Sequence, residues 1–134
     1  MTVLSLLLAL AVSAATSSTT PAATPAATPA AVTPIVCDSC AEWNTEHQPF
    51  RIFGNTYYVG PEGLSSVLIT SAEGHVLIDG ALPQSAPLIA AHIAALGFRI
   101  EDVRWIVSSH AHFDHAGGIA LLQTLHMLEA WEQR

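Results

Sequence analysis

The feature that most constrains this chain is a six-residue segment that holds three histidines and one aspartate: His110, His112, Asp114 and His115. In an extended backbone His110, His112 and Asp114 would point to one side, whereas His115 requires a turn. Neutral imidazoles and a carboxylate are the ligand types of a catalytic zinc, which keeps one position open for water. A merely solvated polar turn is the alternative, but four such groups beside a core are costly to bury unless a cation satisfies them together. The segment therefore predicts a metal site.

The residues on either side of this segment place it in a fold. Residues 103–107 are β-branched and aromatic and predict a buried strand. After Gly117-Gly118, leucines recur at i, i+4 and i+7, so residues 119–131 are predicted to be helical. The segment then lies on a strand-to-helix turn at the carboxyl end of a strand, where open α/β sheets usually place their sites.

Two hairpins and a helix are predicted before this turn. The strands are expected at residues 50–53, 56–59, 65–70 and 75–78. Gly54-Asn55 joins the first pair and residues 72–74 join the second pair. Ser85 is expected to cap a helix that runs to Leu96, with Gly97 as the residue that ends it.

The spacing of the three histidines and the aspartate resembles the metal signature of the metallo-β-lactamase superfamily. More narrowly, the sequence resembles the secreted subclass B3 metallo-β-lactamases in three strings, residues 50–60, 74–79 and 108–118. The resemblance runs from about Cys37 to about Leu122. It implies an α/β (α+β) fold, the αββα sandwich of two similar halves with metals between them, of which this chain would supply about the first half.

The resemblance also implies a role for each residue of the site. Two zinc ions are expected, the first held by His110 and His112 and the second by Asp114 and His115. Each zinc of a B3 enzyme takes one further histidine from the second half of the fold, and no histidine of this chain falls where those ligands are expected. A hydroxide attacks the β-lactam carbonyl, and Asp114 also orients this nucleophile as the catalytic residue. Asp79 would orient a ligand histidine from behind the metals, and a plain turn aspartate is the alternative.

The function that the resemblance implies is zinc-dependent hydrolysis of the amide bond of a small-molecule β-lactam, which confers antibiotic resistance. Because two expected ligands are missing, we expect an incomplete copy, truncated or frame-shifted, with little activity. One alternative is another hydrolase of the superfamily, a lactonase or a thioesterase. The other is a non-catalytic remnant that binds metal weakly.

The start of the chain predicts export. Residues 1–15 contain an apolar run followed by small residues, which is typical of a signal peptide and too short to span a bilayer. Cleavage near Ala14 or Ala15 would release the protein into the periplasm. Residues 16–36 repeat Pro-Ala-Ala-Thr and predict a disordered spacer, so residues 37–134 would form the half-domain described above.

The composition limits the classes of partner that the chain can bind and the roles that its two cysteines can have. The formal net charge is -7 with only 4 basic residues, which excludes a basic surface for nucleic acid or an anionic membrane. Cys37 and Cys40 are too few for a disulfide framework and lack the context of a redox motif. In an exported protein they would form a local disulfide, or one would bond a cysteine outside this chain.

Overall fold

The computed structural model of the chain describes residues 33–132. The predicted signal peptide and most of the predicted spacer therefore lie outside the described residues. Within residues 33–132, no helix combines the length and the apolar character that crossing a bilayer requires.

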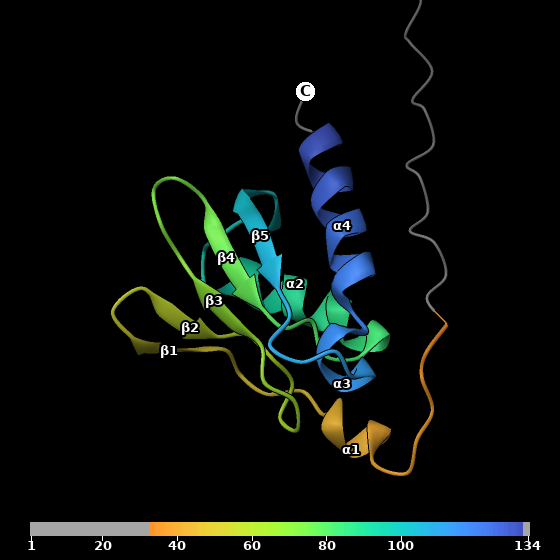
Figure 1. The fold of residues 1–134 in the computed structure, drawn as a ribbon. Helices are drawn as coiled ribbons and strands as arrows, with labels where there is room; N and C mark the ends of the chain where they lie inside the picture. The colour runs from red at the N-terminus through yellow and green to blue at the C-terminus, as the bar shows by residue number, and fades with distance from the viewer. Residues whose placement is uncertain (1–32, 133–134) are drawn as a thin grey trace, which may run out of the picture.

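The fold is built on one five-stranded sheet whose strands follow one another in chain order (Figure 1). Strands β1 to β4 pair antiparallel, and β5 pairs parallel to β4. Their bounds are Phe50–Phe53, Thr56–Tyr58, Val67–Ile69, His75–Ile78 and Val103–Val107. Both predicted hairpins are confirmed, and each turns at a glycine with positive φ, Gly54 at 55° and Gly74 at 119°.

Six short or medium helices complete the described chain. The α-helices are α1 (Cys40–Trp43), α2 (Ala86–Ala95), α3 (Phe113–Ala116) and α4 (Ile119–Glu132). The 3₁₀-helices η1 (Pro83–Ser85) and η2 (Ile100–Asp102) precede α2 and β5. The crossover from β4 to its parallel neighbour β5 runs through α2, so this part is the mixed α/β arrangement that the sequence predicts.

The core lies between one face of the sheet and the helices α2 and α4, which Figure 1 shows together on one side. Leu68 and Leu77 are register partners on adjacent strands, and both are fully buried. Ile89 and Ile93 of α2 and Leu122 of α4 are also fully buried. Burying an aliphatic side chain of this size stabilises a fold by roughly 1.5–3 kcal/mol, so these contacts fix the sheet against the helices.

The opposite face of the sheet is open, which corrects one prediction. Strand β5 forms where it was expected, but Trp105 and Val107 are 53% and 49% exposed. Only Val103 is buried and Ile106 partly buried, because these residues face the helices. The prediction of a buried strand is therefore wrong for one face, since apolar composition does not tell which face another layer covers.

The start of α2 also differs from its prediction. Ser85 precedes the helix but makes no side-chain cap, because it already lies in η1 with a helical backbone. Its hydroxyl hydrogen-bonds the Asn44 side-chain oxygen at 2.5 Å instead. The end of α2 is as predicted, with Gly97 at a φ of 84° directly after Leu96.

The segment before β1 is fastened to η1 and stabilised by a disulfide. Cys37 and Cys40 are bonded to each other. Of the two predicted alternatives, the structure therefore has the local disulfide and not a bond to a cysteine outside this chain. The Gln84 side chain donates to the Ile35 carbonyl at 2.8 Å and accepts from the Ile35 N–H at 3.1 Å. Residues 33–44 therefore dock on the loop that leads from the sheet into α2.

Candidate metal centre

The predicted metal ligands lie on the turn that follows β5, at the carboxyl end of that strand. The backbone of His112 is extended (φ -71°, ψ 156°) and its carbonyl accepts hydrogen bonds from the N–H groups of His115 and Ala116. Helix α3 begins at Phe113, directly after this extended residue. The turn that His115 requires is therefore supplied by the start of α3.

The structure brings the four predicted ligands into one cluster. The ring centroid of His110 lies 4.2 Å from that of His112 and 5.3 Å from that of His115. Nε2 of His115 lies 3.6 Å from Oδ2 of Asp114. His110 and His112 are exposed, whereas Asp114 and His115 are half-buried, so the cluster forms a rim open to solvent.

Asp79 lies behind this rim and contacts His115. One carboxylate oxygen accepts the Ser109 N–H at 2.7 Å. The other accepts the Ser109 hydroxyl at 2.5 Å and lies 2.9 Å from Nδ1 of His115. A carboxylate can only accept, so Nδ1 carries a proton and donates it; in the neutral imidazole the lone pair is then on Nε2, the nitrogen near Asp114.

The pKa values of the two partners shift in opposite directions. Burial by itself would raise the pKa of Asp79, but the hydrogen bonds from Ser109 and His115 and the charge of His115 outweigh it, so the pKa is lowered. The hydrogen bond to Asp79 raises the pKa of His115, against a smaller lowering by burial, and the charges of Asp79 and Asp114 raise it further. Both shifts favour the charged pair in the folded chain.

The pair should make the stability of the metal-free chain depend on pH. His115 contributes fully below its ordinary pKa of 6.5, and this contribution is lost as pH rises through its raised folded pKa. Asp79 contributes fully above its ordinary pKa of 3.8, and this contribution is lost as pH falls through its lowered folded pKa. The stabilisation should therefore be greatest between about pH 4 and pH 6.5.

Urea unfolding of the wild type and of His115→Gln at a series of pH values measures this dependence. The difference between their midpoints should be largest in that window and should shrink on both sides of it. His126→Gln, a partly buried histidine of α4, is the control and should show no such maximum. A difference between wild type and His115→Gln that does not change with pH would contradict the pairing.

The loop after β4 places Asp79 against the turn. Asp79 and Ala81 both have positive φ, 61° and 53°, which is disfavoured for residues with a Cβ. The Gly80 N–H donates to the His115 carbonyl at 2.8 Å, and the Gly118 N–H donates to the Ala81 carbonyl at 3.0 Å. A Cβ on Gly80 would lie 2.9 Å from the backbone nitrogen of Ile119, so only glycine allows this close approach.

The donor set fits zinc in its chemistry and, for one pair of atoms, in its spacing. Two ligands on a tetrahedral zinc with bonds of roughly 2.1 Å lie about 3.4 Å apart. The 3.6 Å between Asp114 Oδ2 and His115 Nε2 is close to that separation. Among the described residues, however, no three histidine, cysteine, aspartate or glutamate side chains converge as a metal site requires. The arrangement therefore supplies two donors for one ion, with His110 and His112 beside them.

Ser109 is the residue of this site that the sequence did not reveal. It donates two hydrogen bonds to Asp79, one from its N–H and one from its hydroxyl. A single serine before the cluster carries no periodic or spacing signal. Only the packing of the end of β5 against the end of β4 shows its contact.

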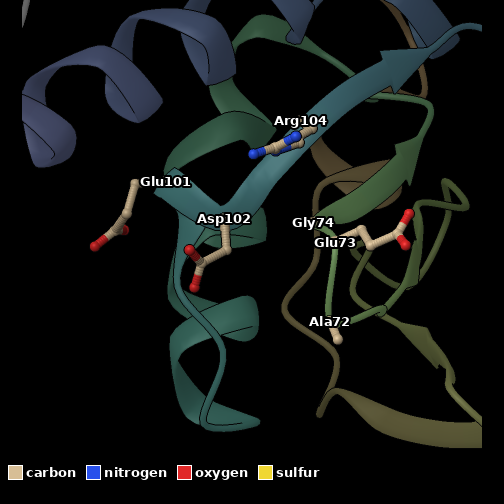
Figure 2. Close-up of a pocket in the computed structure, with 6 residues that line it drawn as sticks. All are labelled: Ala72, Glu73, Gly74, Glu101, Asp102 and Arg104. Carbon is tan, nitrogen blue, oxygen red and sulfur yellow. The ribbon is translucent and has the colours of Figure 1, made fainter.

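A hollow of the described surface lies away from these residues. It has a volume of about 460 Å³ and is lined by residues 72–74 before β4 and by Glu101, Asp102 and Arg104 at the start of β5 (Figure 2). The turn that carries the predicted ligands follows the other end of β5. None of the predicted ligands lines this hollow, so it is not the predicted site.

The chain matches known proteins over its described part. The family model described as the metallo-beta-lactamase superfamily matches residues 59–131, more than half of the 134 residues. Rm3 metallo-beta-lactamase is 66% identical with a TM-score of 0.65, over 68% of this chain and 34% of that one. MEM-A1, a subclass B3 metallo-beta-lactamase isolated from a soil metagenome library, is 63% identical with a TM-score of 0.61, over 62% of this chain and 31% of that one.

A more distant relative is named for a different activity. An N-acyl homoserine lactonase of Bacillus cereus is 31% identical, over 38% of this chain and 30% of the relative. The chain spans about a third of the length of each of these proteins.

Proposed function

Because this chain belongs to the metallo-β-lactamase superfamily, we propose that it provides the first set of metal ligands of a zinc-dependent β-lactam hydrolase. The fold class and the resemblance to subclass B3 enzymes are confirmed by the sheet and by the identities of 66% and 63% to two such structures. The activity, the substrate and the zinc ions are our proposal for a protein that contains the rest of this fold.

One observation carries the proposal. Asp79 holds the proton of His115 on Nδ1, so the lone pair of Nε2 is free on the side where Asp114 Oδ2 lies at 3.6 Å. Two donor atoms of different residues are thus presented together, with the tautomer that metal binding needs already selected. A solvated polar turn would not require a buried carboxylate behind it.

Each residue of the site has a separate role in this proposal. His110 and His112 would hold the first zinc through their imidazole nitrogens, and Asp114 with His115 would hold the second. Bound zinc supplies Lewis acidity to the substrate carbonyl and makes water nucleophilic near neutral pH. Asp114 accepts a hydrogen bond from the attacking water and orients it. Asp79 keeps the His115 imidazole in one tautomer and one orientation.

The bond changes are those of amide hydrolysis. The water oxygen bonds to the carbonyl carbon of the β-lactam, and the bond between that carbon and the ring nitrogen breaks. The nitrogen takes up the proton that the water gives up. The products are a secondary amine and a carboxylic acid, which releases its proton to solvent and becomes a carboxylate, so no oxidant, reductant or second substrate is needed.

A lactonase is the second candidate, because the Bacillus cereus relative is an N-acyl homoserine lactonase. A lactone carbonyl is attacked by the same nucleophile, and only the leaving atom differs. The identities of 66% and 63% to two β-lactamases, against 31% to the lactonase, favour the β-lactam. The third candidate is a remnant that binds metal weakly and does not hydrolyse a substrate.

A chimera tests these three candidates. The residues of this chain that match Rm3 metallo-beta-lactamase replace the corresponding third of that protein. The purified chimera is assayed with a chromogenic cephalosporin and with an N-acyl homoserine lactone, before and after chelation and with zinc restored. We expect zinc-dependent hydrolysis of the cephalosporin. Hydrolysis of the lactone alone would support the second candidate, and no turnover of either would support the third.

We also propose that the protein is exported to the periplasm. The apolar run within residues 1–15 followed by small residues supports this proposal. The mature chain should begin near Ala15 or Thr16 when the gene is expressed in a Gram-negative cell. N-terminal sequencing of the periplasmic fraction measures the cleavage point. A soluble cytoplasmic product that still begins at Met1 would contradict it.

A further inference from the structure

We propose that Ser66, a buried serine outside the metal-binding turn, is a positioning residue for His115 that acts through the backbone of Asp79. The inference rests on the proposed function only in taking His115 as a metal ligand. It assigns a role to the Ser66 hydroxyl, for which the sequence offered no signal. The role applies to the metal-free chain as well as to the chain with bound zinc.

The backbone of Asp79 has an unusual conformation. Its φ of 61° lies in the left-handed region, which residues with a Cβ adopt rarely and only where their surroundings impose it. Asp79 follows β4 directly and is buried. Something must therefore hold the peptide groups on both sides of its Cα.

Three hydrogen bonds hold these peptide groups, one of which runs from the Gly80 N–H to the His115 carbonyl at 2.8 Å. On one side, the Asp79 N–H donates to the carbonyl of Val107, the last residue of β5, at 2.8 Å. On the other side, the Ser66 hydroxyl donates to the Asp79 carbonyl at 2.7 Å, and Ser66 is fully buried. The Ile78 carbonyl is farther from the hydroxyl, at 3.4 Å. Since a hydroxyl has one hydrogen, the Asp79 carbonyl is its main acceptor.

The consequence for His115 follows from the direction of the Asp79 side chain. The left-handed backbone directs the carboxylate onto Ser109 and onto Nδ1 of His115. Without the Ser66 bond, only the bond from the Gly80 N–H to the His115 carbonyl would hold the peptide after Asp79. Asp79 could then return to negative φ more readily, and its Cβ would point elsewhere. Nδ1 would then lose its acceptor, and the proton could move to Nε2, the nitrogen that faces Asp114. A protonated Nε2 has no lone pair for a metal.

A simpler role for Ser66 is the satisfaction of a buried carbonyl, as buried polar groups generally require. That role would affect stability but would leave the tautomer of His115 unchanged in whatever chain remains folded. The state of the His115 ring nitrogens therefore separates the two roles.

The experiment uses the ¹⁵N-labelled 134-residue chain, kept metal-free with a chelator. The pH is increased until the His115 ring no longer titrates, because Asp79 raises the pKa of this imidazole above its ordinary value. Long-range ¹H–¹⁵N spectra distinguish the protonated ring nitrogen from the one with a lone pair. In the wild type, His115 should be mainly the Nδ1–H tautomer. In Ser66→Ala, that tautomer should fall below half of the population while the backbone spectrum stays dispersed.

Ser85→Ala is the matched control. Ser85 is also fully buried, and its hydroxyl bonds Asn44 rather than Asp79. Its loss should lower stability to a similar extent and leave His115 in the wild-type tautomer. If Ser66→Ala does not fold, Ser66→Cys, which keeps a weaker donor of similar size, replaces it and should give an intermediate tautomer population.

Two results would overturn the proposal. One is that His115 keeps the wild-type tautomer in folded Ser66→Ala. If Ser66→Ala does not fold, the same result in Ser66→Cys would overturn the proposal. The other is an equal change of tautomer in Ser85→Ala, which would show a general effect of lost stability. Because the measurement contains no zinc and no substrate, it can succeed even if the chimera proves inactive, so the two proposals fail separately.

Discussion

Replacing Asp114 with alanine should lower cephalosporin hydrolysis by the Rm3 chimera roughly a hundredfold or more. Residues that only orient a metal ligand typically contribute 10–100-fold to metal affinity or activity, so a ligand that also orients the nucleophile should contribute at least as much. Asp114 presents Oδ2 at 3.6 Å from His115 Nε2, and the alanine variant leaves that imidazole alone. His112→Ala should have an effect of the same order through the other ion.

Matched controls show whether these losses are specific. Asp102→Ala removes an exposed aspartate whose recorded partner is Arg99 at 3.8 Å, in the segment before β5. His126→Ala removes a partly buried histidine of α4. Both variants should keep nearly wild-type turnover and zinc content. Wild-type turnover in Asp114→Ala or His112→Ala would refute the assigned roles, and equal losses in the controls would point to a general loss of folding.

The 134-residue chain on its own should bind zinc roughly a hundredfold or more weakly than the chimera and should hydrolyse β-lactams poorly or not at all. The four predicted ligands provide two protein donors for each of two ions, whereas a catalytic zinc normally has three. Among the described residues no third donor converges with either pair. The rim is also open to solvent, so water competes for the metal and weakens the field at the reacting atoms.

Isothermal titration with zinc and a chromogenic cephalosporin assay, on the chain and the chimera side by side, measure both parts of this expectation. His110→Ala in the isolated chain is an internal check, since it should change the residual zinc binding but not an already negligible turnover. Tight binding of two zinc ions with rapid turnover by the isolated chain would show that two protein donors for each ion are sufficient.

Most of the secondary structure could be predicted because its signals are local. Glycines that need positive φ mark both hairpin turns and the end of α2, and all three are found where they were expected. The strand before the histidines was also found, since β-branched and aromatic residues in sequence favour an extended backbone. The two errors concern packing. Whether Trp105 is covered and whether the Ser85 hydroxyl caps α2 or reaches Asn44 depend on residues far away in the chain.

The sequence by itself determined which groups would meet in the turn after β5. His110, His112, Asp114 and His115 lie within six positions, so any compact turn brings them together. Only the tertiary structure decided which residues contact the predicted ligands from the interior. Asp79 and His115 are 36 residues apart, and Ser66 and Asp79 are 13 apart. These contacts arise because β3, β4 and β5 lie side by side, and β3 begins where β4 and β5 end. A hydrogen bond between strand ends depends on that pairing and leaves no periodic pattern in the residues themselves.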